Sequence, residues 1–392
     1  MKILMVLERE FPEDERVEKE ALSLIKAGYE VHLACYTLQN RASIENYKGI
    51  QIHRKPISKF LLKKASVAAL KLPFYFKFWK NFVQKIVNEK KFDVIHIHDL
   101  PLAKIGYETA KKNNLKLILD FHENWAGLLS VSAHTKTLLG KVLSSNTQWE
   151  NYETAYCKLA DQILVVVDEA KDRLVEKGIE KKKIKVVSNT ILLPLNIKNK
   201  EKYDVYTFVY AGGITYHRGL QYVLDGLALV NQTFSDWQLI LVGSGRYVKN
   251  LKNQVKKLKL ENQVYFLEHQ PYYKMMEYIA GADCGLIPHI KSSHTDHTIP
   301  NKLFQYMYLK KPVLVSNCKP LERIVKECNN GFVYKYNQPN QFSEKALKLI
   351  HGKYDNFEEN GYQAVLKKYH WAKEEEKLKK SYTDLNLKEL SY

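Results

Sequence analysis

The stretch "DVIHIHDLPLAKIGYETAKKNNLKLILDFH" (residues 93–122) decides the fold class. Its hydrophobic pattern predicts a strand at 93–99, a helix at 102–114 and a second strand at 116–122. A unit of this length joins two parallel strands through a right-handed crossover. The apolar run "VIHI" in the first strand, like "QILVVV" (162–167), is typical of strands that are buried on both faces. The sequence therefore predicts an α/β protein with a doubly wound parallel sheet.

The same alternation of strands and helices runs outward from this unit in both directions. It begins with the strand "KILMVL" (2–7) and, after a lysine-rich segment, begins again at "YTFVYAGG" (206–213). Two Rossmann-like domains are therefore expected. The predicted division is an N-terminal domain at 1–195, a linker at 196–205, a C-terminal domain at 206–370 and a final helix at 371–392.

The composition narrows the class of protein. A chain of 392 residues is long enough for two or three domains. Its five cysteines are scattered and contain no Cys-x-x-Cys pair, which is typical of a reducing cytoplasm. The first apolar run ends too early for a signal peptide, and no run is long enough to cross a bilayer. We therefore expect a cytoplasmic protein.

A basic and aromatic segment stands out between residues 54 and 91. It holds eleven Lys and Arg residues against a single acid, Glu89, with many Phe and Leu residues between them. This mixture is typical of a helix that lies on an anionic membrane. The alternative is a pair of surface helices with a solvated basic face and an ordinary core stripe. Nucleic acid is not expected as a partner, because no zinc, aromatic RNA-binding or basic-zipper motif accompanies the charge.

The remaining motifs favour phosphate binding. In "YAGGITYHRGL" (210–220), Gly212 and Gly213 would let the backbone approach a ligand, and Arg218 could hold a phosphate with two hydrogen bonds. Pro300 is predicted in the first turn of a helix, where Lys302 and backbone N–H groups could bind an anion. Both loops follow strands, and open α/β sheets bind ligands at the carboxyl ends of their strands.

Other chemistries are less well supported. Gly243 and Gly245 form an isolated Gly-x-Gly, for which a tight turn is a simpler interpretation than a dinucleotide site. A metal site is not expected, because loop histidines more often face solvent or substrate and no second cluster completes a first shell. The side chains considered for that site were His289, His294, Asp296 and His297. No local motif supports a covalent nucleophile.

Several of these segments, in this order, resemble a known family over nearly the whole chain. The segments are "EDERVEKEALSLIKAGYEVHL" (13–33), "DVIHIHDLP" (93–101), "LILDFHEN" (117–124), "VVSNTI" (186–191), "AGGITYHRGL" (211–220) and "IPNKLFQYM" (299–307). The chain resembles the family 4 glycosyltransferases, retaining enzymes of the GT-B fold, in particular a bacterial branch that builds surface glycans. The resemblance implies two facing Rossmann-like domains with a cleft between them. The first would bind the acceptor and the second the nucleotide sugar.

The resemblance also implies roles for individual residues. Catalysis would fall to His122, Arg218 and Lys302. The donor would contact Gly212, Gly213, Gly243, Gly245, His297, Thr298, Ile299, Asn301 and Gln305. Glu123 and Asn124 would lie beside the acceptor. His297 and Gln305 stand where family members usually carry two glutamates, and Gln305 could still hydrogen-bond a ribose through its amide.

The function expected from this resemblance is transfer of a sugar from a nucleotide-diphosphate sugar to a lipid-linked or polysaccharide acceptor. The enzyme would be a metal-independent hexosyltransferase without a cofactor, using a UDP or GDP sugar as co-substrate. It would lie on the inner face of the plasma membrane through residues 54–91. Two alternatives stay open: a nucleotide-sugar 2-epimerase of the same fold, and a non-catalytic relative that binds the donor or serves as a scaffold.

Overall fold

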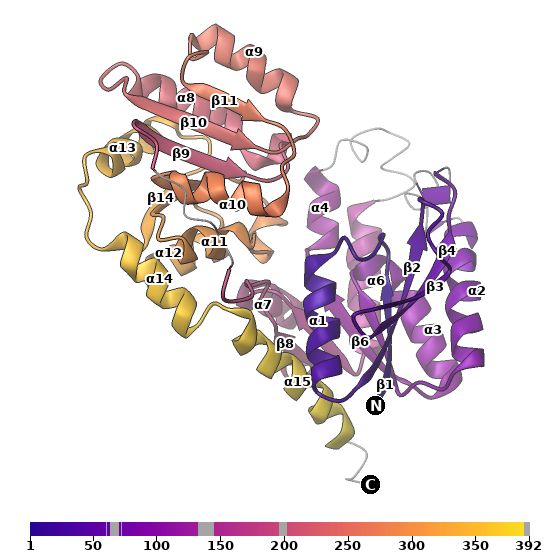
Figure 1. Cartoon of the computed structure of the whole chain (residues 1–392). Coiled ribbons are helices and arrows are strands. Elements are labelled where there is room, and N and C mark those ends of the chain that lie inside the picture. Colours follow the sequence, from indigo (N-terminus) through magenta and orange to yellow (C-terminus); the bar gives the residue numbers. More distant parts are fainter. Residues whose placement is uncertain (60, 63–69, 72, 132–144, 196–201, 388–392) are drawn as a thin grey trace. The chain divides into compact units, whose positions relative to one another are not determined.

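A computed structural model describes residues 1–59, 61–62, 70–71, 73–131, 145–195 and 202–387. The chain forms two compact units, each built around its own sheet (Figure 1). The first unit comprises Met1–Asn189 and Glu374–Tyr392, and the second comprises Thr190–Lys373. Most of the predicted linker, residues 196–201, lies outside the described residues.

The first unit contains an eight-stranded sheet in the order β3-β4-β2-β1-β5-β6-β7-β8. All neighbouring strands are parallel except the edge pair β3 and β4. The strands are β1 Lys2–Leu7, β2 Glu30–Thr37, β3 Ile44–Tyr47, β4 Ile50–Pro56, β5 Val94–His98, β6 Lys116–Phe121, β7 Gln162–Val165 and β8 Ile184–Val186. From Ile3 to Leu7, β1 is buried at every position, as expected for a central strand covered on both faces.

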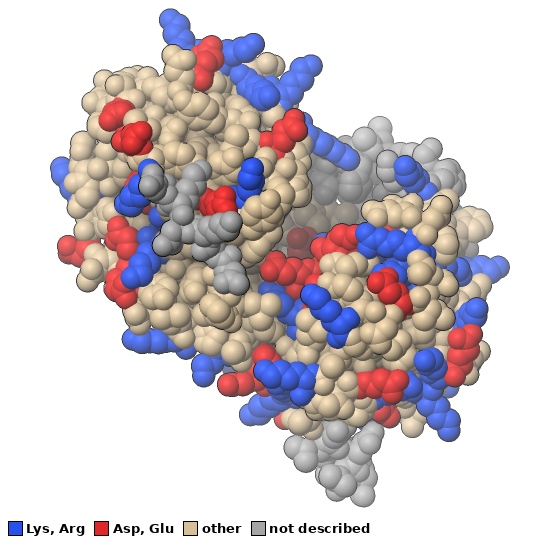
Figure 2. Space-filling model, in the orientation of Figure 1, with Lys and Arg blue, Asp and Glu red and all other residues tan. Residues whose placement is uncertain are grey.

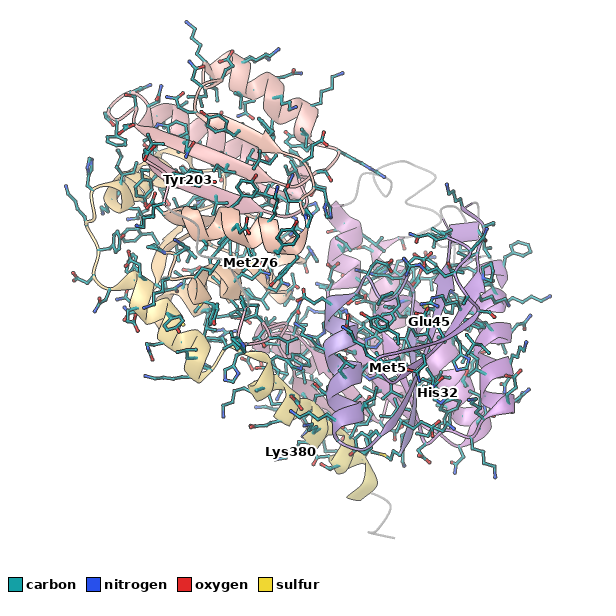
Figure 3. The ribbon with its side chains drawn as sticks, in the orientation of Figure 1. Met5, His32, Glu45, Tyr203, Met276 and Lys380 are labelled. Atoms are coloured by element: carbon teal, nitrogen blue, oxygen red, sulfur yellow. The ribbon has the colours of Figure 1, made fainter. Side chains whose placement is uncertain are left out.

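Helices cover both faces of this sheet. In Figure 1, α1 and α15 lie on one side of it, and α2 and α3 lie on the other. The helices are α1 Glu15–Lys26, α2 Pro73–Glu89, α3 Ala103–Asn113, α4 Trp125–Val131, α6 Asn146–Leu159, α7 Asp168–Glu176 and, from Glu374 onward, α15 Trp371–Leu387. Met5 and His32, labelled in Figure 3, come from the neighbouring strands β1 and β2 and are fully buried between these helix layers.

The second unit contains a six-stranded parallel sheet in the order β11-β10-β9-β12-β13-β14. The strands are β9 Tyr206–Ala211, β10 Trp237–Val242, β11 Val264–Leu267, β12 Cys284–Ile287, β13 Val313–Ser316 and β14 Gly331–Tyr334. The helices are α8 Leu220–Val230, α9 Val248–Leu258, α10 Tyr272–Gly281, α11 Lys302–Tyr308, α12 Lys319–Cys328, α13 Pro339–Ile350 and α14 Phe357–Lys367. Its core is a cluster of buried apolar side chains from the strands, α8, α9 and α13.

Each sheet reverses its winding direction at one place. In the first unit the chain leaves β1 toward β2 and later returns to place β5 on the other side of β1. In the second unit β9 is flanked by β10 and β12 in the same way. Crevices at the carboxyl ends of such strand pairs are the usual ligand sites of open α/β sheets. The topology therefore predicts ligand sites at the loops after β1, β5, β9 and β12.

The prediction of two doubly wound parallel sheets is confirmed, but several elements were missed. The largest omission is the hairpin of β3 and β4, which adds an edge to the first sheet. Its turn, Lys48-Gly49, has positive φ at both residues, which suits a two-residue hairpin loop. The alternating "IQIH" of β4 and the glycine before it were signals that could have located it.

Candidate functional site

The loop after β9 brings a glycine against a lysine. Gly212 has φ 132°, a region that side chains rarely adopt. A Cβ at this position would lie 2.7 Å from the Nζ of Lys302. Gly213 is exposed, and a Cβ there would meet nothing within 4 Å. The loop therefore leaves an open space beside a lysine at the carboxyl end of the central strand.

Lys302 is the first residue of α11, two residues later than the helix was predicted to begin. Pro300 instead lies in the preceding loop, where its carbonyl accepts a hydrogen bond from the N–H of Leu303. The Lys302 side chain is buried, with Nζ 3.9 Å from the centroid of the Tyr210 ring. Burial and, to a smaller extent, the charge of Arg218 hold the pKa of Lys302 well below its usual value.

Arg218 lies in a 3₁₀ turn, Tyr216–Arg218, which precedes α8. Gly219, at φ 74°, separates the turn from the helix and packs so closely on the Pro288 carbonyl that no Cβ would fit. One guanidinium N–H of Arg218 donates to Nε2 of His289 over 3.0 Å, so the imidazole accepts at that nitrogen. Burial first, then Arg218 and Lys302, hold the pKa of His289 well below its usual value.

This cluster is positive and has no carboxylate to balance it. In the described part of the chain neither Arg218 nor Lys302 forms an ion pair with an acid. Burial and the same arginine lower the pKa of His217 to about 4. Buried charges in proteins are normally paired. An arginine, a lysine and close backbone approach at the carboxyl end of a strand suit an anion such as a diphosphate.

The first unit holds a different kind of cluster. His122 follows β6, and its Nε2 donates to Oδ2 of Asp120 over 3.0 Å. Arg16 of α1 donates to Oδ1 of the same carboxylate over 3.2 Å. Burial lowers the pKa of His122, but the attraction of Asp120 and Asp99 outweighs it and raises this pKa to about 9. His122 is therefore a cation at neutral pH, matched by an ionised Asp120.

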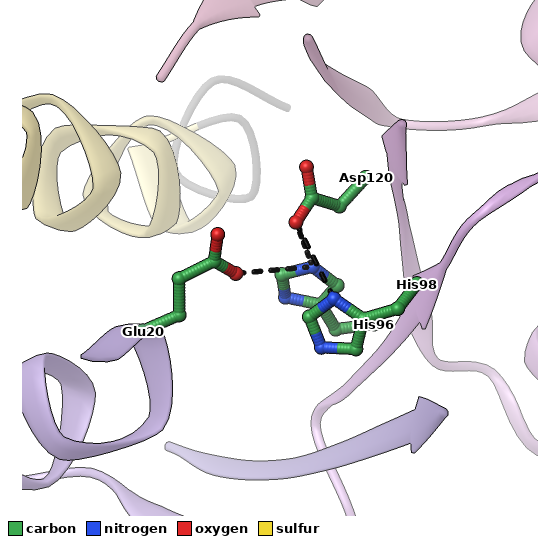
Figure 4. Close-up of side chains that lie close together, drawn as sticks. All are labelled: Glu20, His96, His98 and Asp120. Atoms are coloured by element: carbon green, nitrogen blue, oxygen red, sulfur yellow. Dashed lines mark ion pairs between the residues drawn. The ribbon is translucent and has the colours of Figure 1, made fainter. Parts of the chain in front are cut away.

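Three further buried side chains surround Asp120, as Figure 4 shows: Glu20, His96 and His98. Nδ1 of His98 lies 3.3 Å, and Nε2 of His96 3.6 Å, from Asp120 Oδ2. Such residues could in principle hold a metal ion, but Arg16 lies 2.9 Å from Glu20 and 3.2 Å from Asp120 and would repel it. The sequence analysis missed this cluster, although the two histidines alternate along "VIHIH" and so share one face of β5.

Family comparisons match both units. Residues 16–192 match the family described as "Glycosyltransferase Family 4", and residues 195–364 match "Glycosyl transferases group 1". The chain is a family 4 glycosyltransferase. An uncharacterized glycosyltransferase of Haemophilus influenzae is 26% identical over 298 residues, which are 74% of this chain and 76% of that protein. The enzyme class is therefore sugar transfer from a nucleotide sugar.

Solved structures show the same GT-B fold. The sucrose-phosphate synthase of Thermosynechococcus elongatus has a TM-score of 0.77 at 14% identity, over 98% of this chain and 99% of that one. Anabaena HepE in complex with UDP has a TM-score of 0.72 at 14% identity, over 98% of this chain and all of that one. At these identities the likeness concerns the fold alone.

Two predicted donor-binding glycines of the glycosyltransferase have a packing role. A Cβ at Gly243 would lie 2.1 Å from the Gly212 carbonyl oxygen, and one at Gly245 would lie 1.9 Å from the Ile214 carbonyl oxygen. The N–H of Ile214 donates to the Ser244 carbonyl over 2.9 Å. These glycines therefore fix the loop after β10 against the loop after β9.

The loop before α11 is anchored by its own side chains. Asp296 accepts from Lys291 over 3.1 Å and from the backbone N–H of Lys319 over 2.9 Å, so this acid has a structural role. Gln305 is buried, with its amide 3.5 Å from the Tyr272 hydroxyl. The other predicted donor residues of this loop are His297, which hydrogen-bonds the Ser293 carbonyl, the partly exposed Thr298 and Asn301, and the buried Ile299.

In the first unit, the sequence analysis did not single out Asp99. This residue follows β5 with φ 63° and ψ 162°, a backbone region that is strained for any residue except glycine. Its carboxylate accepts from the backbone N–H of His122 over 3.2 Å and lies 3.9 Å from the Arg9 guanidinium. Of the two predicted acceptor residues, Glu123 is partly exposed, whereas the buried Asn124 side chain accepts from the Gly127 N–H at the start of α4.

The basic segment 54–91 is described in part, and Phe60, residues 63–69 and Leu72 lie outside the described residues. Along α2, Phe76, Trp79 and Phe82 are buried against the first unit, and Phe74 remains 63% exposed. The described part of the segment thus matches the alternative of a surface helix with a core stripe. On the face seen in Figure 2, Lys and Arg are spread among acids. None of the helices in the described ranges is both long and apolar enough to cross a bilayer.

Proposed function

We propose that this glycosyltransferase transfers a hexose from a UDP or GDP sugar, with retention of configuration, to a lipid-linked or polysaccharide acceptor. The observation that carries the proposal is the unbalanced positive charge of Arg218 and Lys302 beside Gly212. A nucleoside diphosphate is the anion that a nucleotide sugar would place there. The second unit would thus bind the donor and the first the acceptor.

The chemistry follows from where charge develops. As the bond between sugar and phosphate breaks, negative charge grows on the diphosphate, and Arg218 and Lys302 stabilise it without reorganising. The acceptor hydroxyl attacks from the leaving-group side, and the departing phosphate oxygen takes its proton. Because two protein cations serve the leaving group, we propose that the reaction needs no metal ion. His122 would contact the sugar and the acceptor as an imidazolium.

Structural relatives support a UDP sugar and a glycan acceptor. Anabaena HepE has been solved in complex with UDP-glucose, and another relative is a lipopolysaccharide outer core galactosyltransferase. Both cover 98% of this chain with TM-scores of 0.71 and 0.67. UDP-glucose is therefore the first donor to test.

The test is to incubate the protein with UDP-glucose, UDP-galactose and GDP-linked hexoses and to separate the products. Release of free nucleotide, unaffected by EDTA, is expected for the cognate donor, and the anomeric configuration of the product reports retention. An epimerised nucleotide sugar would identify a 2-epimerase instead. Binding without any product would identify a non-catalytic relative. Ligand at a hundredfold its Kd should stabilise the protein by about 2.7 kcal/mol in a thermal-shift screen.

We further propose that the enzyme works in the cytoplasm at an anionic membrane surface, through α2 and the basic segment around it. The exposed face of α2 carries Phe74, Lys77, Lys80 and Lys85. Exchanging Lys77 and Lys80 for Glu should weaken sedimentation with phosphatidylglycerol vesicles. The matched control exchanges Lys256 and Lys257 of α9, which are also exposed. Equal loss in both variants would show that net charge, and not this helix, governs binding.

A further inference from the structure

The C-terminal helix reaches the buried cluster of the first unit through one hydroxyl. Tyr382 of α15 is fully buried, and its hydroxyl lies 2.6 Å from Nδ1 of His96, 286 residues away in the sequence. In the described part of the chain no other hydrogen-bond partner of this hydroxyl is found. A buried O–H without an acceptor is strongly unfavourable. Tyr382 is therefore the donor and Nδ1 of His96 the acceptor.

This direction fixes the tautomer of His96. Burial lowers the pKa of His96, so the ring is neutral and carries one proton. With Nδ1 accepting, that proton is on Nε2, which lies 3.6 Å from Asp120 Oδ2 and 4.0 Å from Glu20 Oε2. The N–H dipole thus points toward the carboxylates. In the other tautomer a lone pair would face the ionised Asp120 and repel it.

Asp120 connects the tautomer of His96 to the His122 ring. Its Oδ2 is the atom that both His96 and His122 approach, at 3.6 Å and 3.0 Å. Asp120 is buried, and its carboxylate stays ionised because Arg16 and His122 hold its pKa well below the usual value. The Nε2–H of His96 and the His122 imidazolium compete for the negative charge of Oδ2, so losing the His96 N–H should strengthen the ion pair with His122.

We propose that Tyr382 is a positioning residue for His122: it sets the tautomer of His96, whose Nε2–H shares Asp120 Oδ2 with the His122 ring and so limits the strength of the ion pair between Asp120 and His122. The proposal rests on the proposed function insofar as His122 contacts the substrates. The other titratable or charged groups that face these rings are Asp14, Arg16, Glu20, His98 and Asp99. None of them replaces Tyr382 at Nδ1 of His96.

The first experiment is the pH profile of kcat for Tyr382→Phe. We expect its alkaline limb to shift upward by about half a unit to one unit, the coupling usual within one hydrogen-bond network. The KM for the donor should change less than this limb, because the proposed diphosphate site belongs to the other unit. Tyr29→Phe is the matched control, since the Tyr29 ring lies 5.9 Å from the Tyr382 ring without bonding His96. Equal profiles for Tyr382→Phe and the wild type would overturn the proposal.

A second measurement does not depend on transfer activity. Histidine side-chain ¹⁵N spectra, assigned with His96→Asn and His122→Asn, should show His96 protonated at Nε2 in the wild type and a mixture of tautomers in Tyr382→Phe. The titration midpoint of His122 should rise in the same variant, and this rise should vanish in the His96→Asn background. A rise that persists without His96 would overturn the proposed route. If the wild type shows no transfer with any donor, the proposed function fails while these spectra still decide the role of Tyr382.

Discussion

The two polar clusters of this enzyme differ in how their charges are balanced. In the first unit the cations Arg16 and His122 contact the ionised Asp120. In the second unit Arg218, Lys302 and His289 lie together, and no carboxylate accompanies them in the described residues. The pKa of His122 is raised, whereas those of His289 and Lys302 are lowered.

This difference indicates which cluster has its charges balanced within the protein. A buried group whose pKa favours its charged form has its counter-charge in the protein already. A group whose pKa is pushed toward the neutral form lacks one, and an anionic ligand would supply it. The first cluster is therefore part of the folded structure, whereas the second is arranged for a ligand. Each of the following predictions tests one side of this contrast.

The largest effect is expected from Asp120→Asn. Removing this charge leaves Arg16 buried without its closest ionised partner, because Glu20 has its pKa raised to about 8 and is protonated at neutral pH. Breaking a buried ion pair in this way typically costs about 3–5 kcal/mol. Urea denaturation followed by circular dichroism measures the loss.

Lys302→Met is the matched change in the second unit. It also removes a buried group, but among the described residues the charged side chain that acts on it is another cation, Arg218. We expect the free energy of unfolding to change by less than about 1 kcal/mol, or to rise, since a well-packed apolar group often replaces a buried charge without loss. If Lys302→Met lowered the free energy of unfolding as much as Asp120→Asn, the charge of Lys302 would have a counter-charge in the folded protein, and the contrast between the clusters would be wrong.

Arg218→Ala should reduce turnover on the order of 10²–10³-fold, since it removes one preorganised donor to the leaving group. Because that charge grows in the transition state, kcat should fall more than donor affinity. Arg218→Lys should recover only part, because an ammonium cannot reproduce two parallel hydrogen bonds. Steady-state kinetics with the cognate nucleotide sugar is the measurement, and circular dichroism is the folding control. Turnover near that of the wild type in a folded variant would contradict the phosphate assignment.

Between about pH 6.5 and 8, the stability of the two units should depend on pH in different ways. Burial and nearby acids raise the pKa of Glu20 to about 8 from 4.5, and acids raise that of His122 to about 9 from 6.5. The folded first unit thus binds extra protons and loses stability as the pH rises through this window. Lys302 has a lowered pKa, so the second unit should not lose stability there. The opposing contribution of Lys19, with its pKa lowered to about 8, acts mainly above this window.

Hydrogen exchange with mass spectrometry, corrected for the intrinsic rate at each pH, can follow peptides of the two units separately. Peptides from β1 and β6 should become less protected toward pH 8, and those from β9 and β12 should not. His122→Asn should flatten the response of the first unit. The same pH response in both units would show that the charge contrast does not reach the stability of the fold.

The sequence predicted best what local pattern determines. The strands and the helix between 93 and 122 follow from hydrophobic periodicity, and the close backbone approach at Gly212 follows from a glycine pair after a strand. Tertiary packing determined what was missed. The contact between His96 and Tyr382 joins residues that are 286 positions apart, and no local pattern indicates it. The start of α11 at Lys302 was also misplaced, because a proline fits both the first turn of a helix and the loop before one.

At the proposed donor site, an effect smaller than that of Arg218→Ala is expected from Gln305→Glu, which restores a carboxylate at a position where family members usually carry one. Gln305 is buried, and its amide makes a long contact of 3.5 Å with the Tyr272 hydroxyl. A carboxylate accepts stronger hydrogen bonds from ribose hydroxyls than an amide oxygen does, by about 1 kcal/mol, so donor affinity should rise by up to about fivefold.

Gln305→Met is the control, because it keeps the approximate size of the side chain and removes both polar atoms. Gln305→Met should weaken binding of the donor. In calorimetric titration with UDP-glucose, Gln305→Glu should bind the donor at least as tightly as the wild type. The new carboxylate would also give the second cluster its first acid and so reduce its imbalance of charge. We therefore expect Gln305→Glu to raise the pKa of Lys302, because an added negative charge favours the ammonium. If Gln305→Glu abolished donor binding while the protein stayed folded, the ribose could not lie at this helix. The unbalanced charge of the second cluster would then have to serve another ligand.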